Sequence, residues 1–309
     1  MLSARHRIGC RLTSKNRTDV SSTIGCIPWL LLLSVAMGAR AEQTAAQRDI
    51  EYARVGEHSL KLDLYLPDKS DKPALIVWVH GGAWRSGSKS SMPLNALVAR
   101  GYAVASVDYR LTPVAPFPAQ IHDLKAAIRY LRAKAGDFGL DGRRFAVAGA
   151  SAGGHLAALV GVTNGDRTLE GTVGDNTGIS SDVYAIVSYY GMSNLTTILS
   201  QSTPHGLKVR VPALELLLGG QPPEQSELAK LASPVFHVDA RDPPLLLLHG
   251  DQDPQAPINQ AHELQGVYEK NGRPVEFVVV HGAGHGGDGF FDDTRNKIVA
   301  DFLGRNLAE

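Results

Sequence analysis

Apolar residues recur along the chain after residue 48 in two alternating patterns, one typical of strands and one typical of helices. Eight short apolar runs predict strands: Asp49–Val55, Leu60–Leu66, Ala74–His80, Tyr102–Val107, Phe145–Ala148, Ala185–Tyr189, Pro244–His249 and Val275–Val280. Helical periodicity predicts helices over Ser91–Ala99, Ala119–Ala135, Ala152–Val162, Ile258–Asn271 and Asp292–Leu307. This alternation favours an α/β fold, with a mostly parallel eight-stranded sheet flanked by helices on both faces.

The patterns within two of these strands indicate where they lie in the sheet. Leu60–Leu66 reads LKLDLYL and alternates apolar with polar residues, as a half-buried antiparallel strand does. Ala74–His80 reads ALIVWVH and is apolar almost throughout, which is typical of a strand buried on both faces. We therefore expect the two leading strands to make an otherwise parallel sheet mixed.

One stretch interrupts the alternation. Residues 191–239 contain no clear strand, but helical pieces are expected near Val211–Leu218 and Glu224–Leu231. The stretch is too short for an independent domain. We expect it to form a small helical cap inserted above the carboxyl edge of the sheet, within a single domain that spans residues 42–309.

Charge is uneven along the chain, although the whole is neutral. The 309 residues include 31 Lys and Arg and 31 Asp and Glu, which gives no reason to expect a nucleic acid partner. The first 41 residues hold six basic residues, one acidic residue and both cysteines. The remainder therefore lacks cysteine, which excludes disulfides, zinc–thiolate sites and cysteine nucleophiles there.

The basic leader, residues 1–41, has the pattern of a secretory signal peptide. An apolar run, Ile27–Gly38, follows the basic stretch, and Ala39-Arg40-Ala41 then supplies a small-x-small cleavage signal before Glu42. The run is shorter than the roughly 20 residues that a membrane span needs. We expect cleavage, no stable membrane span, and a secreted or periplasmic protein; an uncleaved anchor or a buried helix is the alternative.

The sequence GASAG at positions 149–153 points to a nucleophile. It follows a predicted strand and opens a predicted helix, which is the context in which G-x-S-x-G forms a sharp turn that exposes its serine. Small residues are needed on both sides of so tight a turn, and Gly149 and Gly153 meet that need. Ser151 is the predicted catalytic nucleophile.

The sequence HGGAW at positions 80–84 predicts an oxyanion hole. Acyl transfer generates an oxyanion that needs preorganised N–H donors, and glycines allow backbone amides to approach the substrate. The predicted donors are the amides of Gly82, Ala83 and Ala152, the last directly after the nucleophile. Trp84 is expected to line the substrate pocket, with core packing as the alternative.

A serine nucleophile needs a base, and the base needs an orienting carboxylate. Two aspartates follow one predicted strand and two histidines follow another, so either member of each pair is a candidate. We prefer Asp253 to Asp251, because it stands further beyond the strand, where a loop can turn it toward a histidine. We prefer His285 to His281, because it lies in a glycine-rich loop.

HGGAW, DYRLTP, GASAGGH, HGDQDP and GAGH, in this order, resemble the bacterial carboxylesterases of the α/β-hydrolase superfamily. The resemblance covers Asp49 to Leu307. Within the superfamily, the chain is similar to both the hormone-sensitive-lipase-like and the feruloyl-esterase-like groups. The first group usually has H-G-G-G and G-D-S-A-G, where this chain has Ala83 and Ala150. The HGDQDP segment looks more like the feruloyl-esterase and prolyl-oligopeptidase pattern, whose catalytic aspartate matches Asp253.

The resemblance implies an α/β-hydrolase fold and a serine carboxylesterase that needs no cofactor and no metal, and the leader adds the expectation that this esterase is exported. Short-chain acyl esters or acylated sugars and phenolics are the expected substrates, either as small molecules or linked to a polysaccharide. An amidase or peptidase shares the same site chemistry and is one alternative. An arylformamidase-like hydrolase is another, although its relatives are intracellular. A non-catalytic binding protein is a third. The sequence does not indicate an oligomeric state.

Overall fold

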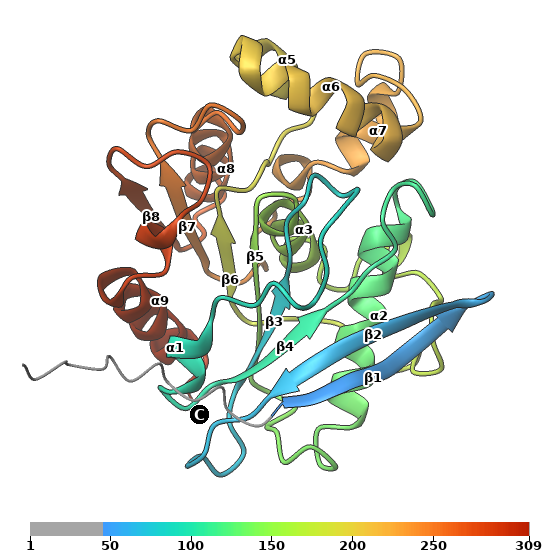
Figure 1. Cartoon of the computed structure of the whole chain (residues 1–309), viewed down its shortest axis with the longest axis vertical. Coiled ribbons are helices and arrows are strands. Elements are labelled where there is room, and N and C mark those ends of the chain that lie inside the picture. Colours follow the sequence, from blue (N-terminus) through green and yellow to red (C-terminus); the bar gives the residue numbers. More distant parts are fainter. Residues whose placement is uncertain (1–45, 309) are drawn as a thin grey trace, which may run out of the picture. The chain divides into compact units, whose positions relative to one another are not determined.

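The structure is a computed structural model that describes residues 46–308, which belong to one compact unit (Figure 1). The predicted signal peptide and its cleavage site before Glu42 lie outside the described residues. Among the helices that are described, none is long and apolar enough to cross a membrane.

In the part of the chain that the structure describes, eight strands form one sheet at the centre of the fold. Its strands are β1 (Ala46–Val55), β2 (His58–Tyr65), β3 (Leu75–Val79), β4 (Ala103–Val107), β5 (Phe145–Ala150), β6 (Ile186–Tyr189), β7 (Leu245–Gly250) and β8 (Val275–Val280). They lie in the order β1-β2-β4-β3-β5-β6-β7-β8. The pairs β1–β2 and β2–β4 are antiparallel and the others are parallel. The predicted mixed, mostly parallel sheet is therefore confirmed.

Helices cover both faces of this sheet. The helices are α1 (Asn95–Val98), α2 (Ala119–Ala133), α3 (Ala152–Gly161), α4 (Arg167–Glu170), α5 (Ile198–Gln201), α6 (Pro204–Leu218), α7 (Ser226–Leu231), α8 (Asn259–Lys270) and α9 (Asp293–Asn306). Leu75 and Val77 of β3 belong to the apolar core shared with α2, α3 and α8. Ile76 and Trp78 face the other way and pack with α1 and α9. Because successive side chains of a strand alternate between faces, a strand covered on both faces must be apolar throughout.

Local capping residues fix several helix ends. The side chain of Asp292 accepts a hydrogen bond from the backbone N–H of Arg295 at the start of α9. At the start of α6, the Thr203 side chain accepts a hydrogen bond from the backbone N–H of Gly206. Pro204 occupies the first helical position, where a backbone N–H would have no intrahelical acceptor. At the other end of α6, Gly219 has a φ of 73°, a left-handed conformation that favours glycine.

Two predicted helices differ from the observed bounds by four residues or more. The predicted helix Ser91–Ala99 begins only at Asn95, because Pro93 disfavours a helical conformation at the residue before it. The helix expected near Val211 begins seven residues earlier, at Pro204, and continues through Pro212.

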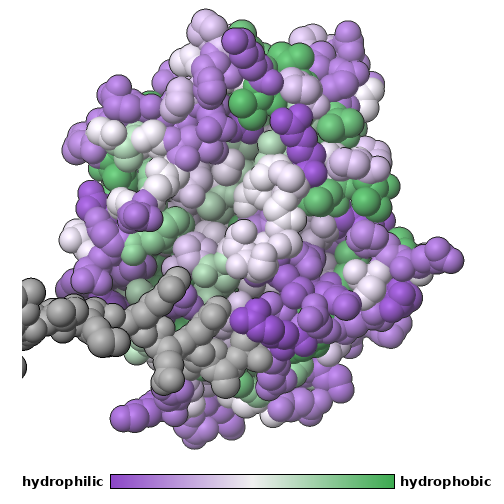
Figure 2. Space-filling view, viewed as in Figure 1, coloured by the Kyte–Doolittle hydropathy of each residue, from purple (hydrophilic) through white to green (hydrophobic). Residues whose placement is uncertain are grey.

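Residues 191–239, called the cap from here on, contain α5, α6, α7 and a short 3-10 turn at Pro234–Phe236. Figure 1 shows these helices at one end of the molecule, beyond the ends of β6 and β7. The surface in Figure 2 is largely hydrophilic, with apolar residues in small separate groups. Val211 and Leu216 of α6 are among the exposed apolar side chains.

Candidate active site

Ser151 occupies the sharp turn between β5 and α3. Its φ of 56° and ψ of −119° are unusual for a residue with a side chain, so the turn is held by its surroundings. A Cβ atom at Gly149 would lie 2.2 Å from the carbonyl oxygen of Gly153, and one at Gly153 would lie 2.0 Å from that of Val79. Glycine is therefore required on both sides of the serine, as the sequence predicted.

Two hydrogen bonds join Ser151, His285 and Asp253. The distance from the Ser151 Oγ atom to the His285 Nε2 atom is 2.7 Å, and His285 Nδ1 lies 2.7 Å from Asp253 Oδ2. Because the Nδ1–H group of His285 donates its hydrogen bond to the carboxylate, Nε2 carries no proton and can accept the hydroxyl proton of Ser151. Ser151 is 9% exposed and lines a cavity, so its hydroxyl group is accessible to a small molecule.

The Asp253 carboxylate is buried and has several donors. Its Oδ1 atom accepts hydrogen bonds from the backbone N–H groups of Gln255 and Ala256, at 2.8 and 2.9 Å. Its Oδ2 atom lies 2.7 Å from His285 and 3.4 Å from His249. Burial alone would raise the pKa of Asp253, but the hydrogen bonds from His249 and His285 outweigh it and hold the pKa well below its usual value. The carboxylate therefore remains ionised beside His285.

The alternative aspartate and histidine form a separate pair at the surface. Asp251 Oδ2 lies 2.8 Å from the Nδ1 atom of His281, and Asp251 also accepts a hydrogen bond from the Gly282 N–H. The His281 side chain is 84% exposed. The structure thus brings Asp253 and His285 to Ser151 and leaves the other pair in solvent.

The loop 80–84 lies against the turn that carries Ser151. Gly82 has a φ of 111°, Ala83 of 52° and Trp84 of 59°, so three successive residues have left-handed backbones. Among the described residues, the N–H groups of Gly82 and Ala83 have no hydrogen-bond acceptor, and both residues line the cavity next to Ser151. Ala152 is the first residue of α3, where a backbone N–H has no intrahelical acceptor.

His80 supports this loop. Its buried ring stacks on Tyr109, with ring centroids 4.5 Å apart, and its Nδ1 atom lies 2.7 Å from the Gly81 carbonyl oxygen. Burial lowers the pKa of His80, so a neutral ring donates to that oxygen. The Tyr109 hydroxyl group donates to the His80 carbonyl oxygen at 3.1 Å.

The expectation that Trp84 lines the substrate pocket is not met. Trp84 is fully buried and is not part of the cavity wall, because the left-handed backbone at Ala83 and Trp84 turns the indole beneath the loop. Its Nε1–H group donates to His155 Nδ1 at 3.1 Å, and the opposite His155 nitrogen donates to the Ala232 carbonyl oxygen at 2.6 Å. Burial lowers the pKa of His155 to about 4, so this ring is neutral. Trp84 and His155 join the loop to α3 and the cap.

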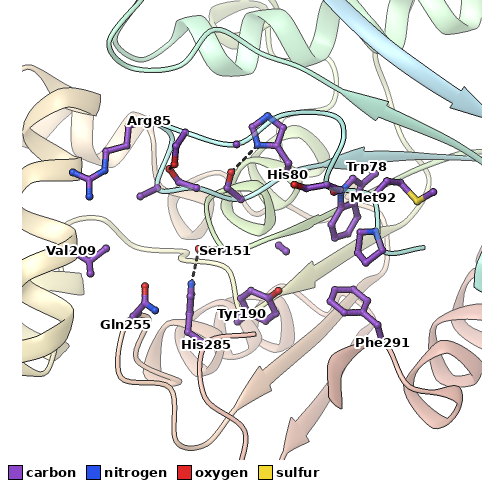
Figure 3. Close-up of a pocket in the computed structure, with 18 of the residues that line it drawn as sticks. Trp78, His80, Arg85, Met92, Ser151, Tyr190, Val209, Gln255, His285 and Phe291 are labelled. Carbon is purple, nitrogen blue, oxygen red and sulfur yellow. Dashed lines mark hydrogen bonds between the residues drawn. The ribbon is translucent and has the colours of Figure 1, made fainter. Parts of the chain in front are cut away.

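The cavity at Ser151 has a volume of about 720 Å³ and two chemically different sides (Figure 3). Trp78, Met92 and Phe291 lie on one side of Ser151, and Arg85, Val209 and Gln255 lie on the other. These lining residues were missed in the sequence. Arg85 directly follows HGGAW and Gln255 directly follows HGDQDP, so adjacency to these motifs was the signal that pointed to these two residues.

Tyr190, directly after β6, also lines the cavity, beside His285 (Figure 3). Its ring packs edge-on against the imidazole, with centroids 5.0 Å apart. Burial, aided by the charge of Asp253, raises the pKa of Tyr190 to about 12, so the hydroxyl group remains protonated at neutral pH. Among the described residues, no group of three or more His, Cys, Asp or Glu side chains could hold a metal ion.

The model of the BD-FAE family matches residues 62–268, a range that contains Ser151 and Asp253. The chain belongs to this family. BD-FAE proteins are α/β-hydrolase esterases, so the predicted superfamily and fold class are confirmed.

Named relatives of this BD-FAE chain are esterases. It is 35% identical over 227 residues to the esterase LipC of Mycobacterium tuberculosis, covering 72% of this chain and 55% of the relative. It is 31% identical over 261 residues to the isoprenylcysteine alpha-carbonyl methylesterase ICME of Arabidopsis thaliana, covering 78% and 60%. The chain spans about half to two thirds of the length of the curated relatives that it matches.

Solved structures of esterases share the fold. A truncated carbohydrate esterase from gut microbiota aligns with a TM-score of 0.77 and 32% identity, over 87% of this chain and 99% of that one. A thermophilic esterase of Thermogutta terrifontis aligns with a TM-score of 0.71 and 26% identity, over 86% and 94%.

Proposed function

We propose that this protein is an exported serine carboxylesterase that hydrolyses carboxylic esters through an acyl-enzyme on Ser151. The observation that carries the proposal is the pair of 2.7 Å hydrogen bonds that link Ser151 to His285 and His285 to Asp253 at the wall of a cavity. The esterase names of the relatives support ester hydrolysis over amide hydrolysis.

In the first half of the reaction, the Ser151 Oγ atom attacks the ester carbonyl carbon while His285 Nε2 takes the hydroxyl proton. The ionised Asp253 carboxylate stabilises the imidazolium that forms. The carbonyl oxygen becomes an oxyanion, and the N–H groups of Gly82, Ala83 and Ala152 are the donors for it. Collapse of this intermediate breaks the ester bond, and His285 gives its proton to the departing alcohol.

In the second half, water takes the place of the alcohol. His285 removes a proton from this water, which attacks the acyl carbonyl, and the same amides stabilise the second oxyanion. Cleavage of the acyl–Ser151 bond returns the proton to the serine and releases the carboxylic acid. All of these steps use groups of this chain and water.

We propose short-chain acyl esters or acylated sugars and phenolics as substrates, as small molecules or linked to a polysaccharide. The cavity of about 720 Å³ has room for such groups. Structures of the Thermogutta terrifontis esterase with propionate and with butyrate bound support a short acyl group. The carbohydrate esterase among the structural neighbours supports a sugar on the alcohol side.

The test uses the purified protein and its Ser151→Ala variant on 4-nitrophenyl esters of increasing chain length, methyl ferulate and acetylated xylan. We expect hydrolysis by the parent and a loss of about 10⁶-fold in kcat in the variant, because the nucleophile is removed and oxyanion stabilisation remains. The preferred ester identifies the acyl group. Wild-type activity in Ser151→Ala would contradict the proposal, and activity on the matching 4-nitroanilides alone would favour an amidase.

Export rests on the leader and is tested separately. We expect the protein recovered outside the cytoplasm of a bacterial host to begin at Glu42, because Ala39-Arg40-Ala41 supplies the cleavage signal. N-terminal sequencing of that fraction measures it. Recovery of the full-length chain in the cytoplasm alone would contradict this part of the proposal.

A further inference from the structure

The charges on the wall of the cavity are all of one sign. Two arginines, Arg85 and Arg210, line it together with Ser151, and none of the described lining residues is a carboxylate. The other titratable lining groups, including His80 and Tyr190, are neutral at neutral pH or belong to the proposed triad. A substrate in this cavity therefore meets a positive field on one side of the nucleophile.

Arg210 is buried and forms no ion pair with any described residue. It lies on cap helix α6 and is 1% exposed. Its Nε–H group donates to the Gln255 carbonyl oxygen at 3.2 Å, but its two terminal nitrogens have no partner among the described residues. Its guanidinium carbon is 5.9 Å from the centroid of the Trp84 ring. Burial lowers the pKa of Arg210 to about 10, so the group is still charged at neutral pH.

A buried guanidinium group with unmet donors is costly to keep. An uncompensated buried charge is destabilising, and buried polar atoms without partners are rare in folded proteins. Asp253 attracts Arg210 electrostatically, but its oxygens are already bonded to His285, His249 and two backbone N–H groups. Within residues 46–308 the terminal nitrogens of Arg210 therefore have no acceptor, although Arg210 lines the cavity in which a substrate could supply one.

Arg85 adds a second positive charge to the same side of the cavity. It follows the loop that carries Gly82 and Ala83, and Figure 3 shows it on the side of Val209 and Gln255, away from Trp78. Within residues 46–308 its side chain has no hydrogen-bond or ion-pair partner. It also lies close enough to Arg210 for the two charges to repel each other. An anion between the two guanidinium groups would relieve this repulsion and satisfy unmet donors.

We propose that Arg210, assisted by Arg85, binds a carboxylate group of the substrate and makes the enzyme selective for esters that carry one. The inference rests on the proposed esterase function and names its substrate class. A guanidinium fork matches a carboxylate with two parallel hydrogen bonds, which an ammonium group cannot provide. The apolar side with Trp78, Met92 and Phe291 then receives the uncharged part of the substrate. The carboxylate belongs to either the acyl or the alcohol part of the ester.

Two matched pairs of esters test the inference and distinguish these sources. 4-Nitrophenyl hemisuccinate and its methyl ester differ in a carboxylate on the acyl side, and 4-acetoxybenzoate and its methyl ester differ in one on the alcohol side. We expect the wild type to prefer the charged member of one pair by about 10- to 100-fold in kcat/KM, the range that a charge-assisted hydrogen-bonded pair supplies. Arg210→Met should remove most of this ratio, and Arg210→Lys should restore part of it.

Arg100→Met is the control. Arg100 is exposed and lies outside the cavity, and its substitution changes the net charge by the same amount as Arg210→Met. We expect it to keep the wild-type ratio. Thermal unfolding reports whether each variant folds, and Arg85→Met replaces Arg210→Met if the latter does not. A wild-type ratio near one in both pairs overturns the inference, as does a ratio that survives the folded Arg210 and Arg85 variants.

A binding measurement separates failure of the inference from failure of the proposed function. Calorimetric titration with succinate needs no turnover, and we expect binding to the wild type that weakens at least tenfold in Arg210→Met. If no ester is hydrolysed but succinate binds in this way, the proposed function fails and the anion site stands. If neutral esters are hydrolysed and neither selectivity nor succinate binding depends on Arg210 or Arg85, the anion site fails and the esterase stands.

Discussion

At the scale of single residues, the polar contacts of Asp253 keep it charged where it meets His285. Two backbone N–H groups and two imidazoles surround the carboxylate, and together they outweigh the effect of burial on its pKa. An ionised carboxylate at neutral pH accepts the hydrogen bond from the Nδ1–H group of His285, which leaves Nε2 free for the Ser151 hydroxyl group. In the proposed mechanism, Asp253 thus acts through the tautomer and orientation of His285.

Asp253→Asn tests this role. We expect kcat for a 4-nitrophenyl ester to fall by roughly 10⁴-fold, because the amide nitrogen favours the wrong imidazole tautomer while the geometry is retained. Asp251→Asn is the matched control and should stay close to wild type, since Asp251 pairs with the exposed His281. Steady-state kinetics measure both. A large loss in Asp251→Asn together with an active Asp253→Asn would reverse the assignment.

The residues that the sequence indicated well are those whose backbone context is local. Ser151 and the glycines beside it form one tight turn, so their spacing is enough to predict it. Trp84 was placed wrongly because its direction depends on a left-handed backbone that no spacing rule indicates. Arg210 was missed because its place at the cavity depends on how the cap packs, and a lone arginine in a helical stretch is normally solvated.

At the scale of elements, the strands were the more predictable part. A buried parallel strand needs an uninterrupted apolar run, and β3 and β7 supply such runs. The first and last residues of the helices were harder to predict. The start of α6 depends on Thr203 and Pro204, while the internal Pro212 suggests a break that does not occur. Pro212 is tolerated in this helix, and nothing in the sequence pattern alone reveals that tolerance.

At the scale of the whole molecule, one buried carboxyl group works against stability at neutral pH. Asp242 precedes β7 and is 4% exposed. Burial raises the pKa of Asp242 to about 7, aided by the charge of Asp239 and opposed by a hydrogen bond from the Asp239 backbone N–H. In the unfolded chain this carboxyl group ionises near pH 4. Between about pH 4 and pH 7 the folded state therefore binds more protons, and stability falls as the pH rises.

Asp242→Asn should remove this pH dependence. We expect the variant to exceed wild type in free energy of unfolding at pH 8 by on the order of 1–4 kcal/mol, and to differ little near pH 4. The asparagine oxygen can still accept from the Asp239 N–H. Urea unfolding at the two pH values measures the difference, with exposed Asp175→Asn as the control. An equal or lower stability of Asp242→Asn at pH 8 would contradict this account.

The contacts of the cap have a consequence for how substrate range can diverge among such enzymes. Thr203 donates a hydrogen bond to the Pro254 carbonyl oxygen and Arg210 donates to that of Gln255, while the Ala232 carbonyl oxygen accepts one from His155 behind the nucleophile. The cap is therefore joined to the loop that follows Asp253 and to α3, which follows Ser151. A chimera that exchanges residues 191–239 therefore has to retain the donors Thr203 and Arg210 and a carbonyl oxygen placed for His155, because these groups hold the cap against residues 253–256 and α3. Exchanging the cap would then change substrate selectivity and turnover together.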